Sequence, residues 1–194
     1  MPTTAERRAH YDDFVDRVRD LCTTPRIRAD LARGQGRPIT ECLPLHRYLS
    51  RPTAGWGARR AHFTTAALVA LEPPRRTTTR PTEPSTPDGW ATTPRWRRPN
   101  LGAALAECAA RRPLTAGGLE RKLNTLIHLS ADHLHPLLPG LADQLLRAGC
   151  RPDWAVWLSD LALWDIDRTA VASHWLDAFY LGRPAAGDPG EQDH

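Results

Sequence analysis

The sequence predicts an all-α protein, a helical bundle, because apolar residues recur at helical spacing along most of the chain. Two further observations support this fold class. No segment alternates apolar and polar residues as a strand would, and residues that favour helix N-caps precede several apolar runs. With 194 residues, the chain is long enough for two small lobes. We expect helical lobes at 1–72 and 100–182, joined by a Pro-, Thr- and Arg-rich loop at 73–99 and followed by a disordered tail at 183–194.

The N-terminal lobe is expected to contain four short helical segments. The first has an apolar face formed by Tyr11, Phe14, Val18 and Leu21. Thr24 and Pro25 predict the start of the second, because Pro is favoured at the first helical position, and Gly34 ends it. Apolar residues within 40–50 and 58–71 predict the remaining two.

The loop at 73–99 has a different composition from its flanks. Seven of the 18 prolines fall there, together with many threonines. The segment also carries six arginines: Arg75, Arg76, Arg80, Arg95, Arg97 and Arg98. Such a composition cannot bury enough apolar surface to order itself. We therefore expect a surface loop or an insertion of open function.

In the C-terminal lobe, four polar residues stand where helix N-caps are expected: Asn100, Ser130, Asp153 and Asp167. The segment 117–128 places its leucines on one face and turns Arg121, Lys122 and Thr125 away from it. The tryptophans of this lobe are expected in the core, with an alternative in which Trp157 or Trp164 is an exposed interface anchor. Asp160 and Asp177 are expected on polar faces.

Charge is distributed unevenly along the chain. Residues 1–80 carry 15 arginines and no lysine against 8 acidic residues, and residues 81–128 have a net charge of +3. Residues 129–194 carry 4 basic and 10 acidic residues. A basic front and an acidic back indicate a polyanion for the first part and a different partner, such as a protein, for the second.

Catalytic motifs are missing from the sequence: there is no GxSxG, P-loop or HExxH pattern. His128 precedes a pair formed by His133 and His135, which would face about 200° apart on a helix and cannot easily share a metal ion. We therefore expect no enzymatic activity, no metal and no cofactor.

The cysteines and the apolar runs bear on the compartment of the protein. No two cysteines form a CxxC pair, and we expect all four to be reduced: Cys22, Cys42, Cys108 and Cys150. No apolar run is long enough to cross a membrane, and the first ten residues lack an apolar signal-peptide core. These observations predict a cytoplasmic protein that does not contact a membrane.

The candidate nucleic-acid-binding residues are basic side chains that are not systematically paired with acids four residues away. They are Arg26, Arg28, Arg33, Arg37, Arg59, Arg60, Arg111, Arg112, Arg121 and Lys122. Such patches suit phosphate backbones, which are bound through charge rather than base sequence. The alternative is a generic basic surface. Because no helix–turn–helix pair with a polar recognition face is evident, we do not expect base-edge readout.

A series of short motifs in the C-terminal half suggests a family. They occur at 100–106, 119–126, 152–155, Asp160-Leu161, Trp164, Trp175 and Phe179-Tyr180. The stretches 26–36 and Trp56 with Arg59-Arg60 fit more loosely. In their order and spacing these motifs resemble the CasB family, the small subunit of the type I-E CRISPR Cascade complex. The resemblance covers most of the chain except 73–99.

The resemblance implies a non-catalytic, all-helical subunit of a crRNA-containing complex. Members form a two-copy row, contact the backbone and large subunits, and help to hold the target and displaced non-target DNA strands. The basic residues that match the family are Arg26, Arg28, Arg59, Arg60, Arg121 and Lys122. Two positions depart from the family, because Ala103 and His128 stand where members often have Arg. The alternative function is a stand-alone, sequence-specific DNA-binding regulator that needs no guide RNA.

Overall fold

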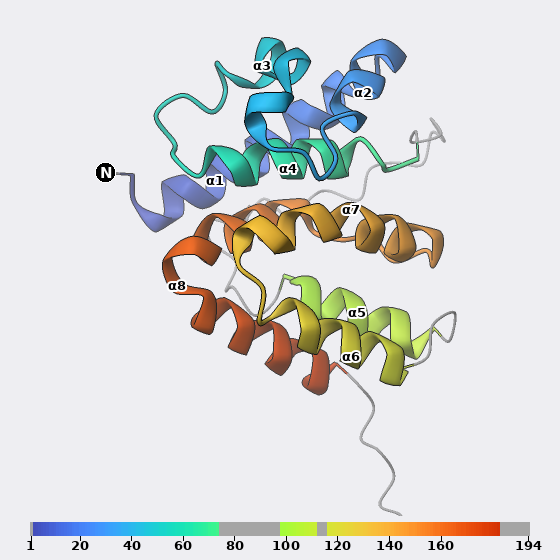
Figure 1. Ribbon diagram of the computed structural model, residues 1–194. Helices are drawn as coiled ribbons and strands as arrows, with labels where there is room; N and C mark the ends of the chain where they lie inside the picture. The colour runs from blue at the N-terminus through green and yellow to red at the C-terminus, as the bar shows by residue number, and fades with distance from the viewer. Residues whose placement is uncertain (1, 74–97, 112–115, 183–194) are drawn as a thin grey trace, which may run out of the picture.

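The structure is a computed structural model that describes residues 2–73, 98–111 and 116–182. Every regular element in these ranges is helical, which confirms the all-α prediction (Figure 1). The elements are α1 (Thr4–Leu21), α2 (Pro25–Ala32), the 3₁₀ turn η1 (Ile39–Glu41), α3 (Leu43–Leu49), α4 (Arg59–Val69), α5 (Leu101–Ala110), α6 (Ala116–Leu126), α7 (Ala131–Arg147) and α8 (Trp154–Leu181). The predicted tail at 183–194 and most of the predicted loop lie outside the described residues.

Three of the four predicted N-caps accept a capping hydrogen bond through the side chain, whereas Ser130 stands at the N-cap of α7 without one. Asn100 accepts a hydrogen bond from the Ala103 N–H at 3.0 Å, and Asp153 accepts one from the Val156 N–H at 3.2 Å. Asp167 has non-helical angles (φ −145°, ψ 69°) and accepts from the Ala170 N–H at 3.1 Å. Since these interactions satisfy N–H groups at the start of a helix, α8 consists of the two predicted helices, joined at a bend.

Helix α8 is the central element of the fold. It contacts α1, α4, α5 and α7, so it lies against helices from both halves of the chain. Buried side chains from both halves belong to one hydrophobic cluster. Trp157 and Trp164 are each 2% exposed, so the alternative in which one of them is an exposed interface anchor is wrong. The division into two lobes stays a prediction.

The backbones of α5 and α8 approach each other at Gly102. A Cβ atom added to Gly102 would lie 1.8 Å from the backbone oxygen of Trp175. Beside it, the Asn100 side-chain amide donates to the His174 carbonyl at 3.0 Å. The cap of α5 and the missing side chain at Gly102 therefore set the distance between these two helices.

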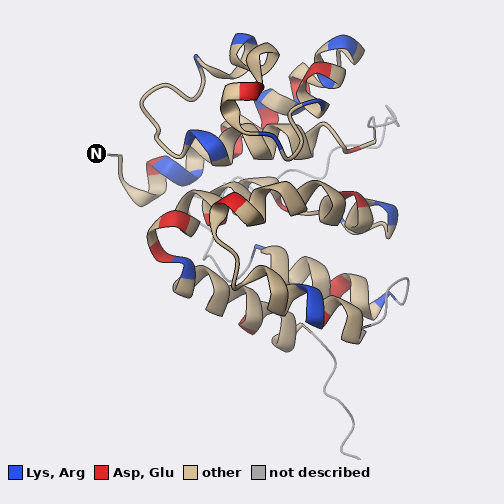
Figure 2. Ribbon diagram, viewed as in Figure 1, with Lys and Arg blue, Asp and Glu red and all other residues tan. Residues whose placement is uncertain are grey.

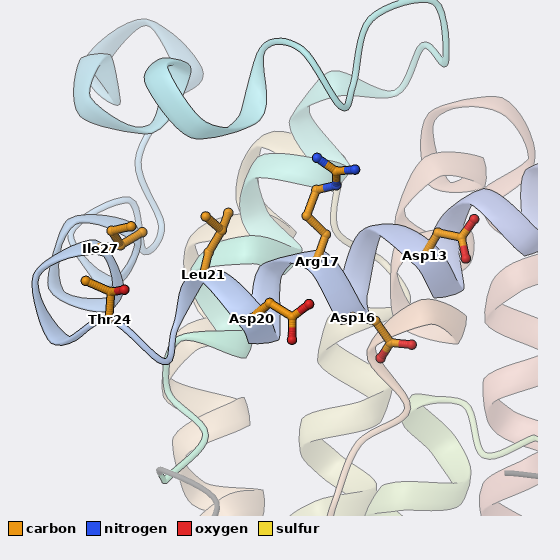
Figure 3. Close-up of a pocket in the computed structure, with 7 residues that line it drawn as sticks. All are labelled: Asp13, Asp16, Arg17, Asp20, Leu21, Thr24 and Ile27. Atoms are coloured by element: carbon orange, nitrogen blue, oxygen red, sulfur yellow. The ribbon is translucent and has the colours of Figure 1, made fainter.

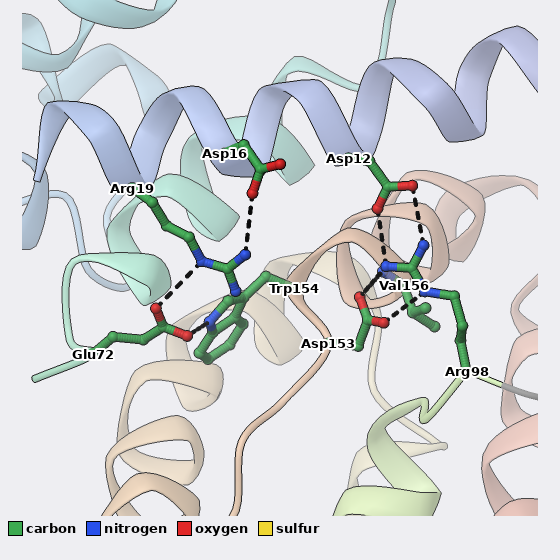
Figure 4. A network of polar contacts seen from close by, with 8 residues as sticks. All are labelled: Asp12, Asp16, Arg19, Glu72, Arg98, Asp153, Trp154 and Val156. Carbon is green, nitrogen blue, oxygen red and sulfur yellow. Dashed lines mark hydrogen bonds and ion pairs between the residues drawn. The ribbon is translucent and has the colours of Figure 1, made fainter. Parts of the chain in front are cut away.

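Two polar networks connect α1 to the start of α8 (Figure 4). Arg98 donates to both oxygens of Asp12 at 2.9 and 3.0 Å and to both oxygens of Asp153 at 2.7 and 2.8 Å. Glu72 accepts from the Trp154 indole N–H at 2.6 Å and from Arg19 at 3.4 Å. Arg98, which the sequence places in the surface loop, therefore has a structural role in the fold.

Two expectations are wrong: the exposure of Asp160 and the reduced state of all four cysteines. Asp160 is 1% exposed and accepts a hydrogen bond from the Trp175 indole N–H at 2.8 Å, because the bend in α8 turns its halves toward each other. Cys108 and Cys150 form a disulfide with their Cα atoms 6.2 Å apart. The two cysteines are separated by 42 residues in sequence, and the packing of α5 beside the end of α7 brings them together. Cys22 and Cys42 are free thiols, as expected.

Three histidines are held in environments that disfavour their charged form. His62 donates from Nδ1 to the Ala58 carbonyl at 3.0 Å, so its Nε2 accepts from His10 Nε2, also at 3.0 Å. His135 is buried and pairs with the Thr64 hydroxyl at 2.7 Å. Burial lowers the pKa of His10 and of His135 to about 4, and it lowers the pKa of His62 as well.

These depressed values predict that stability falls in mild acid. Unfolded histidines bind protons near pH 6.5, whereas the folded chain binds them near pH 4 at His10 and His135. Above pH 6.5, these histidines should therefore not lower the free energy of unfolding. As the pH falls toward 4, the free energy of unfolding should decrease by up to about 1.4 kcal/mol per pH unit for each extra proton that the unfolded chain binds.

Urea unfolding at a series of pH values measures this dependence. His135→Gln should make it shallower, whereas His133→Gln, at an exposed position of the same helix, should leave it unchanged. Equal stability of the unmodified chain at pH 7 and pH 5 would contradict the prediction.

Candidate nucleic-acid interface

The ten basic residues expected to bind nucleic acid have different surroundings in the structure. Arg26, in the first turn of α2, and Arg37, before η1, are exposed. Among the described residues neither side chain is paired with an acid. Both guanidinium groups can therefore reach a partner without first breaking an ion pair.

Arg28 has a structural role. Its guanidinium donates to the Ala70 carbonyl at 2.9 Å and to the Glu72 carbonyl. These carbonyls follow the last turn of α4, where helix ends leave acceptors unsatisfied. Because Arg28 is half-buried and its guanidinium N–H groups bind these carbonyls, it positions α2 against α4. Arg28 thus differs from Arg26, whose side chain is exposed two residues earlier.

Three further candidates are paired with acids. Arg33 pairs with Asp30 at 2.8 Å, Arg60 with Asp132, and Arg111 with Glu107. Only the Arg111 pair has the four-residue spacing on which the sequence expectation rests, so the other two pairs lie outside that expectation. The Arg60 pair could not be predicted from local spacing, because its members lie 72 residues apart. The Arg60 guanidinium lowers the pKa of the Asp132 carboxyl, so the pair stays ionised.

Arg59 stands at the start of α4 and is not paired with a carboxylate in the described part of the chain. It donates to the Ser50 hydroxyl at 2.9 Å, and its guanidinium carbon lies 5.6 Å from the centre of the Phe63 ring. These contacts hold the guanidinium over the C-terminal end of α3. They leave its positive charge uncompensated, so Arg59 remains a candidate for binding an anion.

The solvent face of α6 carries Arg121 and Lys122, as predicted. Both are exposed, while Leu119, Leu123 and Leu126 are buried on the opposite face. Lys122 donates to the neutral Gln144 side chain of α7 at 2.5 Å, and Arg121 donates to the Gly117 carbonyl at 3.3 Å. Neither contact neutralises charge. Arg112 lies outside the described residues.

The candidates of the two halves of the chain lie on different helices, and we group them by those helices (Figure 2 marks Lys and Arg along the ribbon). We call the two groups the α2–α4 surface, which comprises Arg26, Arg33, Arg37, Arg59 and Arg60, and the α6 surface, which comprises Arg121 and Lys122. Helix α7 lies between α4 and α6 (Figure 1), in contact with α4 and linked to α6 through Gln144.

Sequence reasoning missed several exposed arginines: Arg47, Arg51, Arg147 and Arg151. Arg147 pairs with Asp143 at 3.0 Å. Arg47 and Arg51 are four residues apart at the end of α3, a spacing that places two side chains on one helix face. The four-residue spacing could have indicated that the two arginines share a face. However, α3 is short, and its weak helical pattern did not show that both arginines lie on one helix.

Few acidic groups of residues 129–182 are free to dock a partner. Asp132 pairs with Arg60, Asp143 with Arg147, and Asp153 with Arg98, while Asp160 is buried beneath Trp175. Asp177 is exposed, as expected. Four of the seven acidic residues at 129–182 therefore have a partner within the chain, whereas Asp165, Asp167 and Asp177 are exposed.

Two hollows lie away from the basic residues of α6. One, of about 530 Å³, is lined by residues of α1 and the start of α2, including Asp13, Asp16 and Asp20 (Figure 3). Its carboxylates would repel a phosphate. The other, of about 640 Å³, lies between α5 and the end of α8 and includes Ala103 and Leu181. Ala103, where the sequence resemblance leads one to expect Arg, is half-buried in the lining of this groove.

Other kinds of site find little support within 2–73, 98–111 and 116–182. No group of three or more His, Cys, Asp or Glu residues in these ranges could hold a metal ion. His128, His133 and His135 do not form such a group. None of the helices described is both long enough and apolar enough to cross a membrane.

Comparisons with known proteins agree with the all-helical fold. The family model for CRISPR-associated protein Cse2 matches residues 27–180. Two solved structures, described as "CRISPR RNA-guided surveillance complex" and "CRISPR RNA-guided surveillance complex, pre-nicking", contain similar chains. Each matching chain has a TM-score of 0.74 and 28% sequence identity. The first match covers 91% of this chain and the second 90%, and each covers 94% of the matching chain. No curated protein sequence matches. The chain therefore belongs to the Cse2 (CasB) family, the family of the small subunit of type I-E CRISPR Cascade.

Proposed function

We propose that this protein is the non-catalytic small subunit of a cytoplasmic, crRNA-guided type I-E Cascade surveillance complex. In this role it stabilises the R-loop through sequence-independent contacts with the target and displaced DNA strands. Its partners are the crRNA-containing assembly with its backbone and large subunits, and a second copy of itself. The observation that carries the proposal is the match to the Cse2 family over residues 27–180, supported by likeness to chains of surveillance complexes over nine-tenths of this chain.

The strand contacts are supported by the charges that remain uncompensated. Arg121 and Lys122 are exposed on α6, and their hydrogen bonds are to neutral groups. On the α2–α4 surface, Arg26, Arg37 and Arg59 have no carboxylate partner among the described residues. Phosphate backbones attract such groups without regard to base sequence. Because R-loop formation exchanges duplexes of similar stability, a few contacts with separated strands shift the balance toward the open state.

Two separate basic surfaces suit a subunit that contacts two separated strands. Each strand carries its own line of phosphates, and α7 separates Arg121 and Lys122 from the α2–α4 surface. We therefore assign one strand to each surface. Residues already paired with acids, such as Arg60 and Arg111, contribute less because binding must break those pairs.

The proposal is tested by co-purification. We expect the tagged full-length chain, expressed with the other subunits, to carry crRNA and those subunits through purification. The matched control is the same tagged chain expressed without crRNA, which should not recover the whole assembly. A chain that purifies alone in both cases and binds one duplex sequence selectively would contradict the proposal and support the stand-alone regulator.

A further inference from the structure

A third group of basic side chains lies at the end of α3, outside the residues assigned above. Arg47 and Arg51 are exposed, and the helical hydrogen-bond pattern continues past α3 because the Thr53 N–H donates to the Leu49 carbonyl at 3.2 Å. Spaced four apart on this extended turn, the two arginines share a face. Neither is paired with a carboxylate in the part of the chain that the structure describes.

Arg59 joins this group from α4. Its Nη2 lies 2.9 Å from the Ser50 hydroxyl and 3.4 Å from His46 Nδ1. His46 and Ser50 are the sequence neighbours of Arg47 and Arg51, so the Arg59 guanidinium lies at the same end of α3 as these two arginines, on the adjacent helix face. We call this group the α3 basic cluster: Arg47, Arg51 and Arg59. It concentrates three positive charges that have no described acidic partner.

The loop between Arg51 and Arg59 presents an aromatic side chain. Trp56 is half-buried and stacks on His10, with ring centroids 3.9 Å apart and an angle of 4° between the rings. His10 is itself held by His62 through a 3.0 Å hydrogen bond. The indole is therefore fixed in orientation by α1 and α4, although it belongs to a loop.

The loop around Trp56 is open to solvent. Gly55 and Gly57, on either side of the indole, have positive φ angles of 81° and 66°, and an added Cβ at either would meet no atom within 4 Å. A ligand can therefore approach the loop closely at both glycines. An oriented aromatic ring, here in the short loop that joins Arg51 to Arg59, combined with nearby cations is an arrangement that binds single-stranded nucleic acid by stacking bases and pairing phosphates.

We infer that the α3 basic cluster and Trp56 form a binding surface for single-stranded DNA, in which the three arginines contact phosphates and the indole stacks on a base. The inference rests on the proposed function and adds to it a base-stacking residue and two arginines. A duplex keeps its bases stacked inside and cannot use Trp56, so the surface prefers a separated strand over a duplex.

The test measures binding of the full-length chain to a fluorescent oligo(dT) strand over a range of salt concentrations. Arg47→Gln with Arg51→Gln should weaken binding and lower the slope of log K against log salt by about 1.4, that is, about 0.7 for each lost phosphate contact. A control that removes two exposed arginines elsewhere, Arg17→Gln with Arg151→Gln, should leave the slope unchanged. An unchanged slope in the first variant would overturn the arginine assignment.

Stacking is tested separately with Trp56→Leu. This variant should bind oligo(dT) about 5- to 150-fold more weakly with an unchanged salt slope, and Trp56→Phe should recover part of the loss. On an abasic strand of the same length, Trp56→Leu and the unmodified chain should bind equally. An equal loss on both strands, or no measurable binding of the unmodified chain to oligo(dT), would overturn the inference.

The assembled complex separates failure of this inference from failure of the proposed function. If Arg121→Ala with Lys122→Ala destabilises R-loops while the α3 variants do not, the inference is wrong and the proposed function stands. If neither set changes R-loop stability, both are wrong.

Discussion

Gly102→Ala should strongly destabilise the protein, although it adds a single methyl group. The added Cβ would lie 1.8 Å from the Trp175 backbone oxygen and 2.9 Å from the Trp175 Cα atom. Backbone atoms cannot rotate away as a side chain can, so α5 and α8 must separate. Forced overpacking of this kind costs about 3 kcal/mol or more, which corresponds to a decrease of about 6–12 °C in Tm for a chain of this size.

A matched control distinguishes the clash from any general effect of the substitution. Gly140 lies in α7, is exposed, and has no atom within 4 Å of an added Cβ. Gly140→Ala should therefore raise the Tm slightly, because Ala favours a helix by about 1 kcal/mol over Gly. Thermal unfolding followed by circular dichroism measures both variants. Equal Tm values for Gly102→Ala and the unmodified chain would show that α5 and α8 are further apart than described.

The sequence was sufficient to predict the helices because their signals are local. The caps at Asn100, Asp153 and Asp167 need only a polar side chain and the three following residues. The leucine face of α6 needs only a period near four. Each of these features was predicted at the residue where it occurs.

Features that depend on long-range packing were not predictable. The contact of Gly102 with Trp175 and the disulfide between Cys108 and Cys150 join residues from different helices. Asp160 looks like a surface residue until the bend of α8 places Trp175 against it. Their common cause is tertiary packing, which no short window of sequence contains.

For the candidate interface, too, local features were predictable and long-range contacts were not. The sequence identified which segments are basic, and the exposed faces of α2 and α6 agree with it. It could not distinguish Arg28, which binds the carbonyls of Ala70 and Glu72, from Arg26 two residues earlier. The partners of Arg28 lie more than 40 residues away, so its structural role is visible only after folding.

The second large effect is expected for the α6 surface in the assembled complex. Arg121→Ala with Lys122→Ala removes two charges whose present hydrogen bonds are to neutral groups. The variant should assemble normally, because both side chains are exposed. Its R-loops should dissociate faster, since two phosphate contacts are lost. Arg121→Lys alone should have a smaller effect than Arg121→Ala if charge is what matters.

The most direct test of strand capture is R-loop stability of the complete complex as a function of salt, for the unmodified subunit and for Arg121→Ala with Lys122→Ala. We expect the slope of log stability against log salt to fall by about 1.4–1.8 in the variant. Gln144→Ala, which removes the neutral partner of Lys122 but no charge, should keep the original slope. If the double variant and the unmodified complex show the same slope and the same R-loop lifetimes, the α6 surface does not bind DNA and the central claim is contradicted.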